Sequence, residues 1–298
     1  MIVELSLMKR ISKKAGVTDG LVMRYDGNRL KGITDEYGNS NQYNVKEFHS
    51  ADPYNTNDKF IYDANGNMVR DFDRNIVTIR YNCLNLPDTI QFMNGNQILN
   101  HYDATGMKYC TDYITPYTNM TTPVPVDSTC QWTFGEEDMD WSGKWYLGSR
   151  QYSFYKDLGV GTVCSLDRVQ NPYGYHKGSN YYYYQKDHLG NVREVWYDAQ
   201  WVVPRPPKRP YLPDATVQRT QYYAHGLPYA EGTGISTQPN KYNGKEFIEM
   251  HGYDEYDYGW RGLYSAIGRF TTIDLLAEKY YDVSPYAYCL NNPVKYID

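Results

Sequence analysis

The chain has 298 residues, enough for one large or two ordinary domains, and a formal net charge of −5 from 30 basic and 35 acidic residues. Charges of both signs are mixed along it, which argues against nucleic acid as the main partner, since such a partner needs a basic face. Mean hydropathy is low, at −0.72, so we expect a thin, extended core.

Tyrosine is the compositional outlier, with 34 residues against 8 Phe and 6 Trp. Its ring packs on half-buried pleated surfaces while its hydroxyl reaches water. Together with 24 Gly and 15 Pro, this composition predicts β-sheet with many turns.

The five cysteines lie far apart without a CxxC motif, and the six histidines form no HxH or HExxH arrangement. This spacing is typical neither of a disulfide framework nor of a zinc site. We therefore expect mostly reduced thiols, no metal site and no cofactor.

The N-terminal residues 1–16 place a basic run after apolar residues and lack a long apolar stretch. They do not form a secretory signal, and no apolar stretch in the chain approaches the length that spans a membrane. We expect the chain to stay inside, to leave by a signal-free route, or to be part of a longer protein.

Residues 1–113 hold a degenerate repeat in which Tyr precedes Asp or Asn. The steps between these tyrosines are 18, 19, 19 and 21 residues; the tyrosines are Tyr25, Tyr43, Tyr62, Tyr81 and Tyr102. Nearby Asp-Gly and Asn-Gly pairs supply the positive φ of two-residue hairpin turns, and β-formers such as residues 76–81 and 89–92 lie between them. Each unit predicts strand, turn and strand, and such a short unit buries its face only by stacking on neighbours.

Residues 114–142 break the repeat. Their prolines, threonines and asparagines predict an irregular loop, which ends in an acidic cluster of Glu136, Glu137, Asp138 and Asp140. The cluster lacks the spacing and the glycine of an EF-hand, so a solvated loop is favoured over a calcium site.

Strand character returns from residue 143, in residues 146–155 and 181–196. Gly190 and Asn191 are predicted to form the turn of the second segment. His188 has no nucleophile nearby in sequence and is interpreted as a structural turn residue. Residues 203–213 hold five prolines, cannot continue a central strand, and are interpreted as a surface excursion.

The most specific signal lies in residues 256–298. This segment contains, in order, YDYG, an Arg, IGRF, an Asp, LAEKYY, SPYAYC and NNPVKYID. These blocks resemble the core signature of RHS (rearrangement hotspot, or YD-repeat) proteins, as do DHLGNVREV and NKYNGKEF; the best repeat match is YDANGN at residues 62–67. The structural signature residues are Tyr258, Gly259, Gly268, Arg269, Phe270, Asn291, Asn292 and Pro293.

The resemblance implies an all-β fold of antiparallel strands and hairpins wound in a spiral, part of an RHS shell (β-cocoon) with little helix. Residues 1–113 would be degenerate YD-repeat strands, 114–142 the irregular loop, and 143–298 the RHS repeat-associated core. Residues 275–280 are the best candidate for a short helical turn.

The function that the resemblance implies is a structural shell fragment of a polymorphic-toxin-type protein. Such a shell encapsulates and helps to deliver a C-terminal toxin cargo encoded downstream, in bacterial competition. Immunity and secretion-system proteins would be further partners, and the chain would be secreted or at the cell surface as part of a longer chain. The alternative from another class is a surface carbohydrate- or protein-binding module, since exposed Tyr and Trp stack on sugars.

In RHS proteins that cut themselves, an Arg and carboxylates of the core act on a peptide bond just beyond it. Arg261 and Asp274 match that Arg and the Asp after GRF, whereas Ser265 stands where the family has a second carboxylate, and Asp257 is a weaker substitute. Carboxylates suit this reaction because one activates water while a protonated partner supplies a proton to the leaving group. We expect Arg261 and Asp274 to form a structural pair that closes the shell end. Aspartate-dependent autoproteolysis is the alternative, so whether the chain is an enzyme stays open.

Overall fold

The computed structural model describes residues 3–12, 16–36, 48, 58–117, 136–197, 216–232 and 238–297; for 3–12, 16–19, 136 and 230–232 it describes the backbone alone. The predicted surface excursion at 203–213 lies outside the described residues. No helix within the described ranges is long and apolar enough to cross a membrane.

Fourteen of the 21 described strands form one antiparallel sheet, in which strands that are consecutive in sequence pair with each other. We call this sheet the wall. Its strands are β4 (Phe60–Tyr62), β5 (Met68–Asp71), β6 (Ile76–Tyr81), β7 (Pro87–Phe92), β8 (Gln97–Tyr102), β9 (Lys108–Pro116), β10 (Met139–Leu147), β11 (Arg150–Asp157), β12 (Gly161–Asn171), β13 (Gly174–Lys177), β14 (Asn180–Lys186), β15 (Val192–Tyr197), β16 (Thr216–Tyr222) and β17 (Pro228–Gly232).

Two smaller antiparallel sheets complete the described fold. The first holds β1 (Val3–Ser12), β2 (Gly16–Asp26) and β3 (Arg29–Asp35). The second holds β18 (Glu246–Ile248), β19 (Glu255–Asp257), β20 (Gly262–Tyr264) and β21 (Arg269–Phe270). We call residues 238–297, which contain the second sheet, the C-terminal block. Short 3-10 turns are η1 (Glu136–Asp138), η2 (Tyr242–Gly244), η3 (Met250–Gly252), η4 (Ala277–Lys279) and η5 (Cys289–Asn291).

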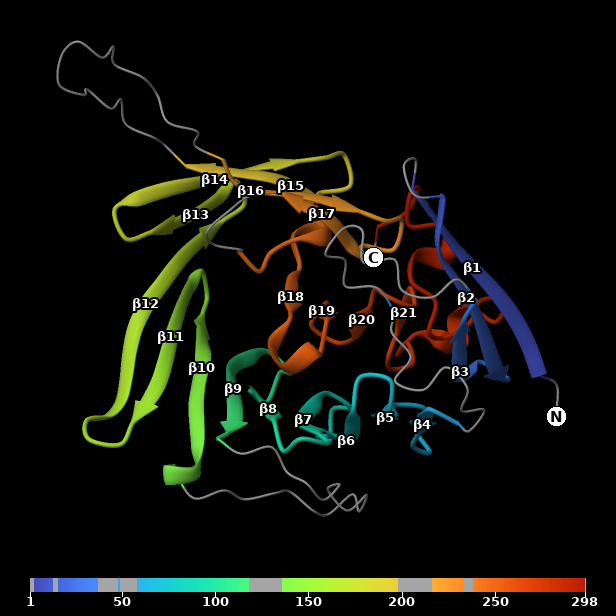
Figure 1. The fold of residues 1–298 in the computed structure, drawn as a ribbon, viewed down its shortest axis with the longest axis horizontal. Coiled ribbons are helices and arrows are strands. Elements are labelled where there is room, and N and C mark those ends of the chain that lie inside the picture. The colour runs from blue at the N-terminus through green and yellow to red at the C-terminus, as the bar shows by residue number, and fades with distance from the viewer. Residues whose placement is uncertain are drawn as a thin grey trace, which may run out of the picture.

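The wall curves into an arc, and the C-terminal block lies inside the curve (Figure 1). The sheet β1–β3 lies on the side that the arc leaves open (Figure 1), and a cluster of buried side chains joins all three sheets. It includes Leu21, Leu30, Phe60, Met68, Tyr264 and Ile267. The predicted all-β fold of antiparallel strands with little helix is confirmed.

Seven connections among the described residues share one turn geometry. The N–H of the first residue donates to the carbonyl of the fifth, and the N–H of the fourth donates to the carbonyl of the first. The fourth residue has a positive φ and is Gly or, once, Asn, as in the three-residue hairpin loop. The turns begin at Asp63, Asn82, Phe92, Asp103, Asp187, Tyr223 and Lys241.

This geometry explains the Asp or Asn of the repeat. Wherever the turn starts with one of them, its side chain also accepts the N–H of the fifth residue, at 2.8–3.1 Å. The predicted two-residue turn is present at Gly27-Asn28, between the paired residues Asp26 and Arg29. At Gly66 and Gly106 that prediction is wrong, because these glycines are the fourth residues of the longer turn.

Three tyrosines that directly precede a turn reach back to an earlier turn of this kind. Each hydroxyl donates to the carbonyl of the residue that directly follows that earlier turn. The pairs are Tyr81 with Met68 at 2.7 Å, Tyr102 with Pro87 at 3.2 Å, and Tyr222 with Val192 at 2.8 Å. In the Tyr-Asp/Asn pairs, the Asp or Asn therefore closes its own turn while the Tyr ties neighbouring hairpins together.

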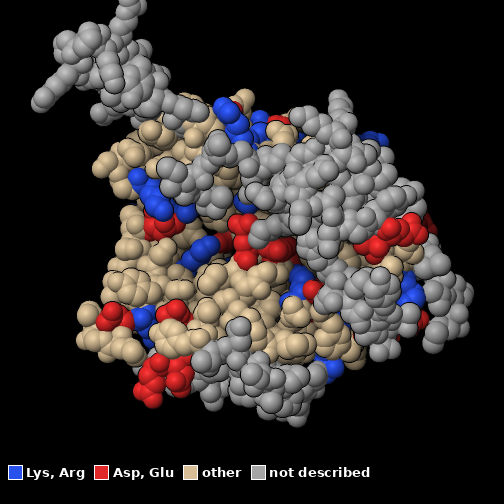
Figure 2. All heavy atoms as spheres, viewed as in Figure 1, with Lys and Arg blue, Asp and Glu red and all other residues tan. Residues whose placement is uncertain are grey.

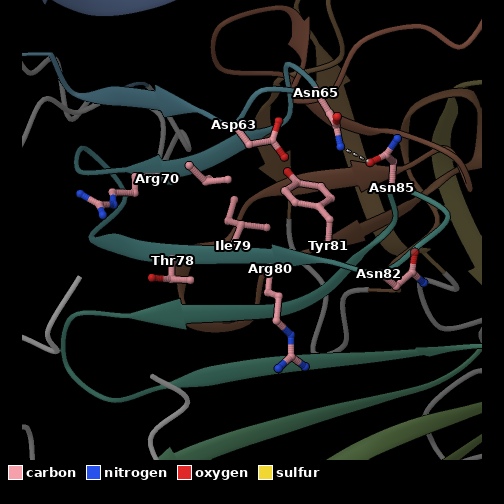
Figure 3. A pocket seen from close by; sticks show the side chains of 10 residues that line it. Asp63, Asn65, Arg70, Thr78, Ile79, Arg80, Tyr81, Asn82 and Asn85 are labelled. Carbon is pink, nitrogen blue, oxygen red and sulfur yellow. Dashed lines mark hydrogen bonds between the residues drawn. The ribbon is translucent and has the colours of Figure 1, made fainter. Parts of the chain in front are cut away.

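Neighbouring turns also contact each other through side-chain amides. Asn65 donates to the Oδ1 of Asn85 at 3.2 Å, and Asn67 donates to the same oxygen at 3.1 Å. Figure 3 shows the first of these bonds beside Tyr81, at the rim of a cavity of about 350 Å³ on β5 and β6. The residues that line this cavity all belong to the repeat, and none of the predicted catalytic residues is among them.

Strand β14 shows how the tyrosines divide between two faces. Tyr182 and Tyr184 pack against a buried cluster around Tyr175, whereas Tyr181 is 54% exposed. The strand segments predicted at 181–196 and 76–81 are present, and η4 supplies the helical turn predicted within 275–280. Of the residues predicted to form an irregular loop, 114–116 belong to β9 and 139–142 to β10, and 118–135 lie outside the described residues.

Candidate functional site

Arg261 and Asp274 form an ion pair in the C-terminal block. Arg261 Nη1 lies 2.9 Å from Asp274 Oδ2, and the guanidinium stacks on the Phe270 ring at 3.7 Å from its centroid. The other carboxylate oxygen, Oδ1, accepts the N–H of Leu276 at 2.7 Å. The expected pairing is present, and the carboxylate has both oxygens engaged.

The pair borders a cavity of about 450 Å³. Asp274 is the one carboxylate among the described residues that line it. The last described part of the chain, Tyr296 and Ile297, also lines this cavity. The described lining of this cavity therefore lacks the second carboxylate that a two-carboxylate mechanism requires. Glu278, which the sequence analysis did not single out, lines a smaller adjacent cavity of about 220 Å³ together with Asp274.

Asp257, the weaker catalytic candidate, pairs with the wall. Its Oδ2 lies 2.5 Å from Lys108 Nζ of β9, and its Oδ1 accepts the N–H of Gly259 at 2.7 Å. The structure thus gives Asp257 a role in docking the block, apart from the Arg261–Asp274 pair.

The other signature residues hold the block together or attach it to the sheets. The Tyr258 hydroxyl lies 2.9 Å from that of Tyr288 and donates to Asn243 at 2.8 Å. Arg269 donates to the Asn28 carbonyl at 2.8 Å. Phe270 and Pro293 are buried, Asn291 and Asn292 are exposed, and Gly259, Gly268 and Asn291 have positive φ.

A second carboxylate of the block, Glu246, also binds the wall. Glu246 and Asp257 are direct cross-strand partners, an arrangement that repels when both are charged. Lys144 of β10 offsets it, with Nζ 2.7 Å from Glu246 Oε1, and Tyr146 donates to both oxygens of Glu246. On the face shown in Figure 2, acidic and basic side chains likewise lie next to one another in a hollow.

The pKa of Glu246 reflects this docking. Burial raises the pKa, but the charges of Lys144 and Lys108 and the bonds from Lys144 and Tyr146 more than offset it and lower the pKa to about 2. Glu246 is therefore ionised at neutral pH and holds the block to β9 and β10 as a charged group.

A buried cluster around Arg74 joins the block to β5. The guanidinium lies 2.5 Å from Asp71 and 2.8 Å from Glu255, and stacks on Tyr264 at 3.9 Å. The pKa of Glu255 is raised above its ordinary value, because the effect of burial exceeds the opposing effect of the Arg74 charge. Each of these charged side chains is at most 5% exposed, so removal of one would leave an uncompensated buried charge.

Three potential metal ligands that sequence spacing did not reveal meet on β8 and β9. They are His101, Cys110 and Asp112, whose ligand atoms all lie within 4.8 Å of one another. The two strands pair in register, and this brings together a His and a Cys that are nine residues apart in the sequence.

The predicted turn histidine and acidic cluster occupy surface positions. His188 lies in the turn that starts at Asp187, where Asp187 accepts backbone N–H bonds from Leu189 and Asn191. The turn interpretation of His188 thus agrees with its place in the fold. The acidic cluster lies in η1 and at the start of β10, so its placement in a loop was wrong, but Glu137, Asp138 and Asp140 are exposed as a solvated cluster requires.

Solved structures of toxin complexes share this fold. They are the crystal structures of TcdB2-TccC3-Cdc42 (14% identity, TM-score 0.53), TcdB2-TccC3-TEV (12%, 0.54) and TcdB2-TccC3 without hypervariable C-terminal region (13%, 0.55). Each match covers 99% of this chain and 18% of the other, so the chain spans less than a fifth of their length. No family model matches the chain, and no curated protein does.

Proposed function

We propose that this chain forms part of a toxin-encapsulating shell and helps to deliver a C-terminal cargo. The observation that carries the proposal is the wall that curves around the C-terminal block (Figure 1), in which the last described residues, Tyr296 and Ile297, line the cavity beside Arg261. A polypeptide that continues from this point starts within the wall. The RHS signature and the fold shared with the TcdB2-TccC3 structures support the same function.

The inside of such a shell must hold a cargo without binding it irreversibly. Tyrosine suits that surface because its ring is apolar and its hydroxyl forms hydrogen bonds. The cargo would be a toxin encoded downstream, and the whole protein would be secreted or displayed at the cell surface. Immunity and secretion-system proteins would be its further partners.

Autoproteolytic release of the cargo is the second candidate function. The observation in its favour is the shared cavity, in which Arg261 and Asp274 face Tyr296 and Ile297 near the end of the chain. The single carboxylate and its ion pair with Arg261 favour the structural role. No second carboxylate lines the described part of the cavity to act as a proton donor beside Asp274.

Sugar binding at the outer surface is a third candidate. Tyr183 and Trp196 of β14 and β15 stack with ring centroids 4.4 Å apart, and Trp196 is 41% exposed. Loss of glycan-array binding in Trp196→Ala would support this function, and absence of binding by the wild type would exclude it for the sugars on the array.

Encapsulation is tested on the gene product read past Asp298. The purified protein is treated with trypsin, and the downstream segment is followed by mass spectrometry. We expect that segment to survive while the shell is folded and to be digested once urea unfolds it. Digestion at the same rate in both states, or a gene that ends at Asp298, would overturn the proposal.

A further inference from the structure

The His101, Cys110 and Asp112 side chains form a compact set on two wall strands. His101 of β8 is the register partner of Cys110 of β9, and Asp112 lies two residues further along β9, on the same face. His101 Nε2 is 3.0 Å from Asp112 Oδ2, and the Cys110 thiol donates to Asp112 Oδ1 at 3.5 Å.

The set combines fixed ligands with an open side. Cys110 is 6% and Asp112 7% exposed, and both are held by strand pairing with β8 and β10. The His101 side chain is 42% exposed. A small ion can therefore reach the two buried ligands past the imidazole.

The ligand types select the metal. Imidazole nitrogen, thiolate sulfur and carboxylate oxygen suit Zn²⁺ and similar divalent ions, whereas Mg²⁺ and Ca²⁺ prefer all-oxygen sites. Bonds of about 2.0–2.3 Å place neighbouring ligand atoms of a tetrahedral zinc site about 3.3–3.8 Å apart. The 3.5 Å between Cys110 Sγ and Asp112 Oδ1 lies within that range, and the 3.0 Å between His101 Nε2 and Asp112 Oδ2 lies just below it.

We propose that His101, Cys110 and Asp112 bind one Zn²⁺-class ion, with solvent in the fourth coordination position. The Cys110 S–H bond breaks on binding, the sulfur electron pair goes to the metal, and the proton leaves to solvent. The ion would fasten β8 to β9 within the wall. The competing description is a metal-free trio in which the carboxylate of Asp112 binds both neighbours.

Cobalt is the probe, because Co²⁺ bound to a thiolate gives a near-ultraviolet charge-transfer band. We expect the metal-stripped chain to bind one Co²⁺ with this band, and Zn²⁺, but not Mg²⁺, to displace it. Cys110→Ser should abolish the band, and His101→Gln should weaken binding by more than about tenfold. Cys164→Ser, at an exposed thiol on β12, should bind like the wild type.

Two controls keep the result decisive. Far-ultraviolet circular dichroism checks that each variant keeps the wild-type β spectrum, and His101→Gln serves as the test if Cys110→Ser does not fold, because His101 is partly exposed. The proposal is overturned if the wild type gives no charge-transfer band at saturating Co²⁺. It is equally overturned if the band persists in folded Cys110→Ser, or if Cys164→Ser loses it.

Discussion

The carboxylate of Glu255 fills the space beside Gly262, so that a Cβ at position 262 would overlap Glu255 Oε2. The two residues lie on the adjacent strands β19 and β20 of the C-terminal block. The absence of a side chain at position 262 leaves room for the carboxylate that pairs with Arg74.

Gly262→Ala should therefore destabilise the chain. The methyl group forces the buried carboxylate away from Arg74, and overpacking of this kind costs about 1–3 kcal/mol. Chemical denaturation measures the loss. Gly159→Ala is the matched control, because the nearest atom to a Cβ there is Asp157 Oδ1 at 3.5 Å. Equal stability of the two variants would contradict the assigned role of Gly262.

The tyrosine bonds between successive turns predict a second effect. Tyr81→Phe removes the bond to the Met68 carbonyl and should lower the free energy of unfolding by about 0.5–1.5 kcal/mol. Tyr109→Phe, in which the side chain is 48% exposed, should leave it nearly unchanged. Thermal unfolding of both variants beside the wild type provides the comparison. A Tyr81→Phe variant as stable as Tyr109→Phe would show that the bond contributes nothing.

The sequence predicted this fold because the repeat is local. The tyrosine spacing and the glycines that follow Asp63 and Asp103 by three residues are both features of a single hairpin, and such hairpins stack in sequence order. The bonds from Tyr81 and Tyr102 back to an earlier turn were not foreseen. They depend on which hairpin lies next to which, and single-strand patterns do not contain that information.

The candidate site was predictable in part. We expected Arg261 and Asp274 to pair because both match positions of the RHS core signature, and the structure contains that ion pair. The partner of Asp257 was not foreseen, because Lys108 lies 149 residues earlier (257 − 108) on a different sheet. The His101 set was also missed, since strand register and not motif spacing brings its members together.

Glu246 should make attachment of the block sensitive to acid. Its folded pKa of about 2 lies below the ordinary value near 4.5, so its contribution is fully present above about pH 4.5 and is lost as the pH falls toward 2. The contribution at neutral pH is about 3 kcal/mol at most. Glu246→Gln should lose stability at pH 7 and approach the wild type near pH 2.

Urea denaturation at several pH values measures that difference. Glu278→Gln, which changes an exposed glutamate of η4, controls for the loss of a carboxylate elsewhere in the block. A Glu246→Gln deficit that stays constant from pH 7 to pH 2 would mean that the charge of Glu246 does not hold the block.

The Arg261–Asp274 pair yields the last prediction, on its stability. The Asp274 side chain is 32% and the Arg261 side chain 13% exposed, so the pair lies between the buried class, where breakage costs about 3–5 kcal/mol, and the exposed class, worth about 0–1 kcal/mol. We expect about 1 kcal/mol for Asp274→Asn, because the amide oxygen still accepts the Leu276 N–H. Arg261→Ala should cost more, since it also removes the stack on Phe270.

A double-mutant cycle with the combined variant separates the pair from these other contacts. A coupling energy near 1 kcal/mol, together with an uncut gene product extending past Asp298, fits a structural pair. Coupling near zero, with self-cleavage that disappears in Asp274→Asn, would instead show that the carboxylate serves catalysis. The structural result is expected, because Asp274 already has both oxygens engaged and, within the described lining of its cavity, has no second carboxylate to share a proton.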